Sequence, residues 1–306
     1  MAATSAGTAA FAGFERRELP TSRGPVHAVV GGDGPPLLLL HGYPQSHLMW
    51  HAAAPLLADR HTVVASDLAG YGASFRPLPS ADHAPHGKRA MALDQVEAMA
   101  ALGFDRFCVA GHDRGGRVAY RMALDHPGRV ERLAVLDIVP TAEVWRRADR
   151  RFARGYWHWA FLAQPAPLPE RLIGGDPQAF FDLHVCAAIG LGAEPGRYPP
   201  GIVDAYRRIL DDPGAVEAIC EDYRAGASID VTHDDADRDD GRTITCPVLV
   251  LWGARGALPG FYADVLDVWR PWAPDVRGEA LDAGHFLAED RPEETAARLL
   301  AFLADT

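Results

Sequence analysis

A short segment centred on Asp113 has the residue types and spacing of a catalytic turn. Residues 111–115 read GHDRG and lie between an apolar strand-like run and a helical pattern. Glycines that flank a polar residue at a strand-to-helix turn are typical of a nucleophile elbow, where Ser is the usual nucleophile. An aspartate there favours a different reaction, because a carboxylate can displace a leaving group from saturated carbon and become an ester. The alternative is that Asp113 only caps the following helix.

Two backbone N–H groups could stabilise the negative charge that develops while such an ester is hydrolysed. Residues 41–44 read HGYP and follow an apolar run that ends at Leu40. A loop in this place can offer the N–H of Tyr43 to an oxyanion, and the N–H of Arg114 would be the second donor. We therefore expect Tyr43 and Arg114 to form an oxyanion hole.

A base and an acid that orients it are also present in a suitable order along the chain. Residues 283–286 read AGHF just after the last strand-like run, which makes His285 the candidate base. Asp137 directly follows another apolar run, whereas no carboxylate follows the run 247–252 closely. We expect Asp137 to orient His285 and to stabilise its charged form, with a capping role as the alternative.

These residues need a scaffold, and the pattern of apolar runs indicates an α/β fold with a mostly parallel sheet. Continuous apolar runs that alternate with helical patterns predict strands buried on both faces. The strand-like runs are 36–40, 62–66, 107–110, 133–136, 247–252 and 276–281. Apolar residues at three- and four-residue spacing predict helices over 88–102, 116–124 and 293–303.

The alternation of strands and helices stops between about Pro140 and Arg242. This stretch holds helical patterns with no strand-like run between them, which indicates a helical insertion. We predict a core domain formed by residues 1–139 and 243–306 and a helical cap domain formed by residues 140–242. The cap should cover the carboxyl edge of the sheet, where ligands bind in such folds.

Composition and charge argue against several classes of partner. The 306 residues include 30 Lys+Arg and 41 Asp+Glu, for a formal net charge of −11. Without a Lys/Arg-rich run, nucleic acid and anionic membranes are poor candidates. Residues 1–12 lack the pattern of a signal peptide, and the four cysteines have no metal-ligand spacing. We expect a cytoplasmic protein with reduced thiols and without a membrane span.

Two segments that superficially suggest metal binding are interpreted as structural. The acidic run 234–241 fails as a calcium loop, because Asp240 and Cys246 stand where Gly and Glu are required, so we expect a solvated connector. His47 and His51 are four residues apart, but no acidic residue accompanies them. We therefore predict no metal site.

Seven segments together resemble the Asp-nucleophile branch of the α/β-hydrolase family, and within it the fluoroacetate (haloacetate) dehalogenases. Each segment alone is weak, but the set in this order is specific and extends over nearly the whole chain. The segments are 41–45, 67–72, 111–118, 136–141, 157–165, 220–227 and 284–287. The resemblance implies an α/β-hydrolase fold with the cap inserted after the sixth strand. It also implies a cofactor-free hydrolase that converts short 2-haloacids to hydroxyacids and halide and that forms a homodimer.

The resemblance also implies roles for individual residues. Asp113 matches the nucleophile, Asp137 and His285 match the acid and base, and no metal is involved. Arg114 and Arg117 match the pair that holds the substrate carboxylate. The sequence supports this pair independently, because residues three apart share a helix face and guanidinium groups bind carboxylates well. Surface ion pairs are the alternative for both arginines. His158, Trp159 and Tyr223 match the three residues of the cap that hold the halide in this family.

Two other functions are compatible with these residues, and one residue departs from the family pattern. An epoxide hydrolase would use the same triad with tyrosines of the cap, for which the candidates are Tyr156, Tyr198, Tyr206 and Tyr223. A non-catalytic ligand-binding member of the fold is the third possibility. Ile189 stands where the family tends to have Trp, which predicts a looser acid pocket. Activity on chloroacetate, bromoacetate or larger 2-haloacids is then expected to be comparable to or better than defluorination.

Overall fold

The fold is built on one eight-stranded sheet with the order β1-β2-β4-β3-β5-β6-β7-β8. The structure is a computed structural model that describes residues 11–193, 196–199 and 201–304, so most of the segment 1–12 lies outside it. The strands are β1 (Glu15–Leu19), β2 (Val26–Gly31), β3 (Pro36–Leu40), β4 (Thr62–Ser66), β5 (Phe107–His112), β6 (Val130–Leu136), β7 (Val248–Gly253) and β8 (Val276–Leu281).

The strands from β3 to β8 are parallel, which confirms the predicted mostly parallel sheet. Strands β1 and β2 form an antiparallel hairpin that pairs with β4 and was not predicted. Parallel strands end at the same edge of a sheet, so Leu40, His112 and Leu136 bring the loops that follow them together. This shared edge positions the candidate catalytic residues.

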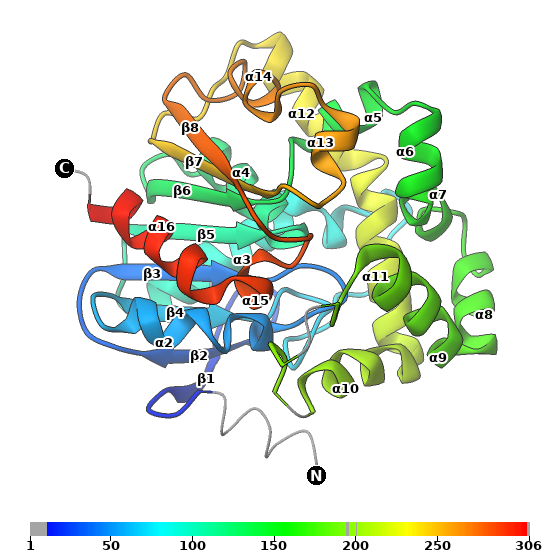
Figure 1. Cartoon of the computed structure of the whole chain (residues 1–306), viewed down its shortest axis with the longest axis horizontal. Coiled ribbons are helices and arrows are strands. Elements are labelled where there is room, and N and C mark those ends of the chain that lie inside the picture. Colours follow the sequence, from blue (N-terminus) through cyan, green and yellow to red (C-terminus); the bar gives the residue numbers. More distant parts are fainter. Residues whose placement is uncertain (1–10, 194–195, 200, 305–306) are drawn as a thin grey trace.

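Helices cover both faces of the sheet (Figure 1), with α2 and α16 on one face and α3 and α4 on the other. The elements outside the insertion are η1 (His47–Trp50), α2 (Ala53–Ala58), η2 (Ala84–His86), α3 (Lys88–Ala101), α4 (Arg114–Asp125), α13 (Leu258–Phe261), α14 (Val265–Trp269), α15 (Leu287–Asp290) and α16 (Pro292–Ala304). The helices expected over 88–102, 116–124 and 293–303 correspond to α3, α4 and α16.

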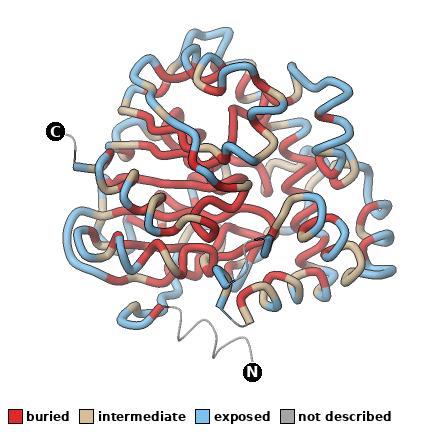
Figure 2. The backbone as a smooth tube through the Cα atoms, in the orientation of Figure 1, coloured by how far each residue is buried: buried red, intermediate tan, exposed pale blue. Residues whose placement is uncertain are grey.

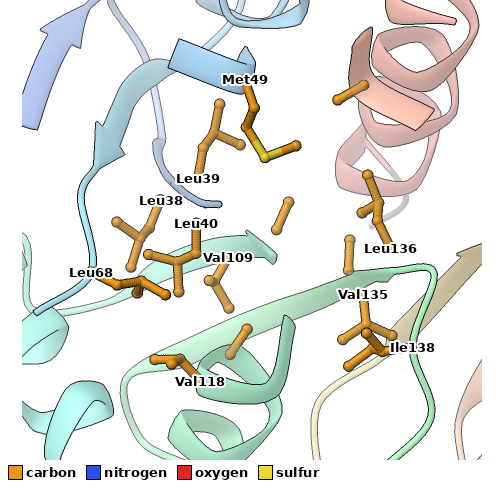
Figure 3. Packing of buried hydrophobic residues seen from close by; sticks show 14 of the residues in the cluster. Leu38, Leu39, Leu40, Met49, Leu68, Val109, Val118, Val135, Leu136 and Ile138 are labelled. Carbon is orange, nitrogen blue, oxygen red and sulfur yellow. The ribbon is translucent and has the colours of Figure 1, made fainter. Parts of the chain in front are cut away.

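The central strands are buried along their length, as the red segments in Figure 2 show. Leu38, Leu39 and Leu40 of β3 pack beside Val109 of β5 (Figure 3), and each of these side chains is at most 1% exposed. Burying a large aliphatic side chain stabilises the fold by about 1.5–3 kcal/mol. A fully packed core of this kind holds the strand ends rigidly, which is what a preorganised site requires.

The elements that the structure describes between β6 and β7 are all helical, and they lie beyond the carboxyl edge of the sheet (Figure 1). They are α5 (Thr141–Arg146), α6 (Arg150–Gly155), α7 (Trp157–Leu162), α8 (Leu168–Gly175), α9 (Pro177–Phe180), the π-helix η3 (Phe181–Ile189), α10 (Ile202–Arg207), η4 (Arg208–Asp211), α11 (Pro213–Gly226) and α12 (Ile229–Asp239). The division into a core and a cap at residues 140 and 242 remains a prediction.

The expected solvated connector at 234–241 was wrong for most of its length, because helix α12 extends to Asp239. Asp234 and Asp237 lie three residues apart on one helix face and are buried against Arg121 of α4. Asp234 Oδ2 also accepts a hydrogen bond from the Tyr120 hydroxyl (2.8 Å). The buried arginine that these carboxylates need comes from a distant segment, so local sequence reasoning could not find it.

Two expectations about the chain as a whole can be compared with the structure. No helix in the described residues is long and apolar enough to span a membrane. All four cysteines are free, and Cys108 and Cys220 are buried. Burial raises the pKa of the Cys108 thiol to about 11, so this sulfur is a poor nucleophile at neutral pH.

Candidate active site

Asp113 lies on the strained turn between β5 and α4, with φ 47° and ψ −115°. The flanking glycines are required by close packing, since a Cβ on Gly111 would lie 2.4 Å from the Gly115 carbonyl oxygen. A Cβ on Gly42 would lie 2.4 Å from the Asp113 Cβ. The Asp113 side chain makes no capping hydrogen bond to α4, so its alternative role as an N-cap is not observed. Backbone strain of this kind is common at functional sites.

His285 lies between Asp137, the residue expected to orient it, and Asp113, the expected nucleophile. Its Nδ1 is 2.6 Å from Asp137 Oδ2, and its Nε2 is 4.0 Å from Asp113 Oδ2. Asp137 Oδ1 accepts the Gly253 backbone N–H (2.9 Å), which holds the carboxylate in place. His112 Nε2 donates to the His285 carbonyl oxygen (2.8 Å) and fixes that loop. The 4.0 Å gap is too long for a hydrogen bond and suits a base that acts on a water molecule.

The electrostatics around Asp113 favour its ionised form. Burial would raise the pKa of Asp113, but His285, His112 and the two nearby arginines together lower it to about 2. For His285, burial acts to lower the pKa, but the hydrogen bond and charge of Asp137 and the charge of Asp113 outweigh it, so the pKa is raised. Asp113 is therefore a carboxylate at every pH near neutrality.

One of the two expected oxyanion donors contacts the Asp113 carboxylate. The Tyr43 N–H donates to Asp113 Oδ1 (2.9 Å). Arg114 is the first residue of α4, where backbone N–H groups have no partner within the helix. The Tyr43 N–H is thus placed to stabilise charge on an oxygen of the Asp113 carboxyl group, and the same role for the Arg114 N–H remains a prediction.

Arg114 is buried in an ion pair that sequence reasoning missed. Its Nε donates to Asp222 Oδ2 (2.9 Å) and its Nη2 to Asp222 Oδ1 (2.6 Å). Asp222 also accepts from Lys88 and from the Tyr71 hydroxyl. Arg114 Nη1 is buried without a hydrogen-bond partner. Only one end of the Arg114 guanidinium therefore remains for a ligand, and the surface ion pair considered as an alternative is not observed.

Arg117 is a buried cation without a carboxylate partner among the described residues. It is 3% exposed, and its Nη1 donates only to the Val139 carbonyl oxygen (2.9 Å) and Thr141 Oγ1 (3.2 Å). Its Nε has no partner. Burial and the neighbouring Arg114 lower its pKa, yet a guanidinium stays protonated in proteins. A buried unpaired charge is costly, so an anionic ligand would stabilise this position.

We predict that Arg117→Gln raises KM for an anionic haloacid by about 10- to 150-fold. A hydrogen bond to a charged group contributes about 1.5–3 kcal/mol, and this variant removes it without breaking an ion pair. Steady-state halide release measures the effect, and Arg106→Gln is a matched control because Arg106 is 66% exposed. An unchanged KM in Arg117→Gln would rule out this arginine as a carboxylate ligand.

The three residues expected to hold the halide belong to the insertion, and two of their rings contact Arg114 and Arg117 of α4. The Arg114 guanidinium lies over the Tyr223 ring (4.2 Å), and that of Arg117 lies over the Trp159 ring (4.5 Å). The ring centroids of His158 and Tyr223 are 5.9 Å apart. Burial lowers the pKa of His158 well below its usual range, so this imidazole is neutral and carries one N–H donor. An imidazole, an indole and a phenol thus share one side of the cavity.

The cavity at Asp113 is small and partly enclosed. The centre of a water-sized sphere can move within only ≈ 10 Å³ of it. It is lined by Tyr43, Asp113, Tyr156, His158, Trp159, Ile189, Tyr223 and His285. Ile189 lines this cavity, and the looser acid pocket expected from its smaller side chain remains a prediction. The cavity favours a substrate of very few heavy atoms.

The sequence did not reveal the role of Asp222, and it left open which tyrosines line the cavity. Asp222, which holds Arg114, precedes the recognised Tyr223, but nothing local indicates that its carboxylate is buried. Of the four tyrosines considered for an epoxide, Tyr156 and Tyr223 line the cavity. The hydroxyls of Tyr198 and Tyr206 instead donate to carboxylates of α15.

The fold and the elbow geometry define an α/β hydrolase. The family model for the alpha/beta hydrolase fold matches residues 35–292, so the chain belongs to this family. A fluoroacetate dehalogenase of Burkholderia sp is 47% identical over 295 residues, which cover 96% of this chain and 95% of the relative. A soluble epoxide hydrolase of Corynebacterium sp. (strain C12) is 33% identical over 91% of this chain and 93% of its own. These matches confirm the resemblance found in the sequence.

Solved structures give the same fold. A crystal structure described as an α/β hydrolase from Nostoc sp. PCC 7120 has a TM-score of 0.91 at 48% identity, covering 96% of this chain and 99% of its own. The epoxide hydrolase CorEH without ligand has a TM-score of 0.81 at 29% identity, covering 95% and 98%.

Proposed function

We propose that this protein hydrolyses the carbon–halogen bond of short 2-haloacids, converting fluoroacetate or chloroacetate to glycolate and halide. The observation that carries the proposal is the buried Arg117, which has no carboxylate partner in the described structure and lies near an aspartate nucleophile. A substrate carboxylate would supply the missing charge. The 47% identity to a fluoroacetate dehalogenase and the small cavity support the same substrate class.

In the first step, an Asp113 oxygen attacks the carbon that bears the halogen. The carbon–halogen bond breaks, its electron pair leaves with the halide, and an ester forms between Asp113 and the carboxymethyl group. Arg117 and the free end of Arg114 would hold the substrate carboxylate. His158, Trp159 and Tyr223 would donate hydrogen bonds to the departing halide, which matters most for fluoride because it is a poor leaving group.

In the second step, water attacks the carboxyl carbon of the Asp113 ester. His285 Nε2 takes a proton from the water, and Asp137 stabilises the resulting imidazolium. The N–H groups of Tyr43 and Arg114 stabilise the oxyanion. The intermediate then expels glycolate, whose hydroxyl oxygen takes the proton from His285. The second proton of the water is released to solvent, so Asp113 returns as a carboxylate that carries one oxygen of the water.

We predict that the two steps respond differently to pH. Alkylation needs ionised Asp113, whose pKa is about 2, so its single-turnover rate should be flat between about pH 5 and 8. Ester hydrolysis needs neutral His285, whose raised pKa means that the neutral fraction grows as pH rises through that value. Rapid-quench measurement of ester decay should therefore show a rate that increases with pH and then levels off. A decay rate that falls with rising pH would contradict His285 as the base.

The apparent pKa for ester decay should lie below that of His285 in the free protein. The charge of Asp113 contributes to the raised pKa, and esterification removes that charge while Asp137 remains. A titration of His285 by NMR in the ligand-free protein supplies the reference value.

An epoxide hydrolase is the second candidate, because two phenols, Tyr156 and Tyr223, line the cavity and could donate to an epoxide oxygen. Halide release from fluoro-, chloro- and bromoacetate and 2-chloropropionate, measured beside diol formation from styrene oxide, separates the two. We expect halide release, highest with the two-carbon acids, and no diol. Turnover of styrene oxide without halide release would reverse this assignment, and binding of haloacids without either reaction would indicate a non-catalytic member of the fold.

We further propose a cytoplasmic homodimer, with a small-molecule haloacid as substrate and neither cofactor nor metal in the reaction. The homodimer rests on the resemblance to the family, and the cytoplasmic location rests on the four free cysteines. Light scattering at the assay concentration tests the dimer.

A further inference from the structure

Two histidines and two carboxylates form a cluster outside the active-site cavity. His27, His47 and Asp67 each offer one possible metal-ligand atom, and these atoms all lie within 4.8 Å of one another. The ring centroids of the two histidines are 5.1 Å apart. None of these residues lines the cavity at Asp113. The cluster has no role in the proposed reaction.

The sheet brings the members of this cluster together from distant parts of the sequence. Glu18 of β1 lies directly opposite His27 of β2, so their side chains share one face of the sheet. The Asp67 N–H donates to the His27 carbonyl oxygen (2.8 Å), which continues this register at the end of β4. His47 begins η1 and lies above the same face, in ring contact with His27. The acidic residue that the sequence does not place near His47 is therefore Asp67, which directly follows β4.

His27 is oriented by a carboxylate that contacts one ring nitrogen, as is usual for a histidine that binds a metal through its other nitrogen. His27 Nδ1 lies 2.7 Å from Glu18 Oε1, which leaves His27 Nε2 available. His47 Nδ1 lies 2.8 Å from Asp67 Oδ1, so a cation that binds both atoms would replace the proton between them. Asp67 also accepts the backbone N–H groups of His47 and Ala73, which keep its carboxylate fixed.

The surroundings can admit an ion. The three residues line a groove that also includes Arg16 and, from the insertion, Ala205 and Ile209. Asp67 and Glu18 carry two negative charges against the one positive charge of Arg16. Ligand atoms around tetrahedral zinc lie about 3.4 Å apart, for bonds of about 2.1 Å. A small inward rotation of the His27 or His47 ring would reach this spacing from the 4.8 Å limit.

We propose that His27, His47 and Asp67 form a binding site for a divalent transition-metal ion such as Zn²⁺, with Glu18 as the residue that orients His27. Two imidazoles and one carboxylate are a ligand set that suits zinc, copper and nickel rather than magnesium or calcium. Three protein ligands leave a coordination position for water. The site is independent of the proposed dehalogenation.

Isothermal titration of the metal-free full chain with Zn²⁺ alone tests this site. We expect one ion per chain for the wild type and loss of that binding in His27→Gln and in His47→Gln. Glu18→Gln should weaken the affinity by about 10- to 100-fold, because it removes only the orienting group. Glu18 is 58% exposed at its side chain, so this variant should fold even if the histidine variants do not.

His83→Gln is the matched control, since His83 forms a similar pair with Glu221 (2.7 Å) away from the cluster. It should bind Zn²⁺ like the wild type. With Cu²⁺ as the probe, electron paramagnetic resonance should show coupling to two imidazole nitrogens in the wild type. The proposal is overturned if the wild type binds no stoichiometric ion, or if Glu18→Gln and both histidine variants bind Zn²⁺ with unchanged affinity.

Discussion

Asp113→Asn should reduce halide release from chloroacetate by at least about 10⁴-fold, the scale seen when a catalytic nucleophile is removed. The substitution keeps the shape of the side chain but replaces the charged oxygen that must attack carbon. An amide oxygen is a much weaker nucleophile, and no nearby group can take over, because Asp137 is held by Gly253 and His285. A chloride-release assay under steady-state conditions measures the loss.

A matched variant separates chemistry from folding. Asp149 caps α6 on the surface by accepting from the N–H groups of Arg151 and Phe152. Asp149→Asn should keep near wild-type activity. The Asp113→Asn protein should retain the wild-type melting profile and still bind the product glycolate in a titration, since the arginines remain. Activity within tenfold of wild type in Asp113→Asn would show that Asp113 is not the nucleophile.

His285→Ala should release about one halide per chain in a single burst and then stop. Alkylation of Asp113 does not need the base, whereas ester hydrolysis does, so the ester should accumulate. Rapid mixing with bromoacetate, followed by mass spectrometry of the peptide that contains Asp113, should show an added carboxymethyl group. Removing such a base costs about 10⁴- to 10⁶-fold in multiple turnover.

The partner of the base provides the control for this trapping experiment. Asp137→Asn should leave the ester detectable but decaying slowly, because the imidazole is present and only its orientation and charge stabilisation are lost. Rapid multiple turnover in His285→Ala, or a His285→Ala protein that releases no halide at all, would contradict the assigned role.

The parts of the fold that could be predicted are those whose signal is local. The run 36–40 is apolar along its whole length, and β3 has those same bounds. Strand β1 was missed because four of its five residues are exposed, and it reads ERREL, so it has no apolar pattern. Its place depends on pairing with β2 across a turn, which is information that its own residues do not carry.

The candidate site likewise has residues with a local sequence signal and contacts that have none. Asp113, Asp137 and His285 could be located because each follows a recognisable strand in the expected order, and the structure brings the three together. The Asp222 carboxylate that forms an ion pair with Arg114 comes from the insertion, 108 residues away in the chain. The cluster of His27, His47 and Asp67 likewise depends on three separate strands and turns. Contacts of this kind follow from tertiary packing, and spacing along the chain does not reveal them.

The central claim is that an ester of Asp113 lies on the reaction path, and a single turnover in H₂¹⁸O tests it most directly. With protein in excess over chloroacetate, we predict that the labelled oxygen enters the Asp113 carboxylate and that the first glycolate formed is unlabelled. This follows because water attacks the carboxyl carbon of Asp113 and not the substrate carbon. Label found directly in the glycolate, with none in the peptide that contains Asp113, would contradict the covalent mechanism.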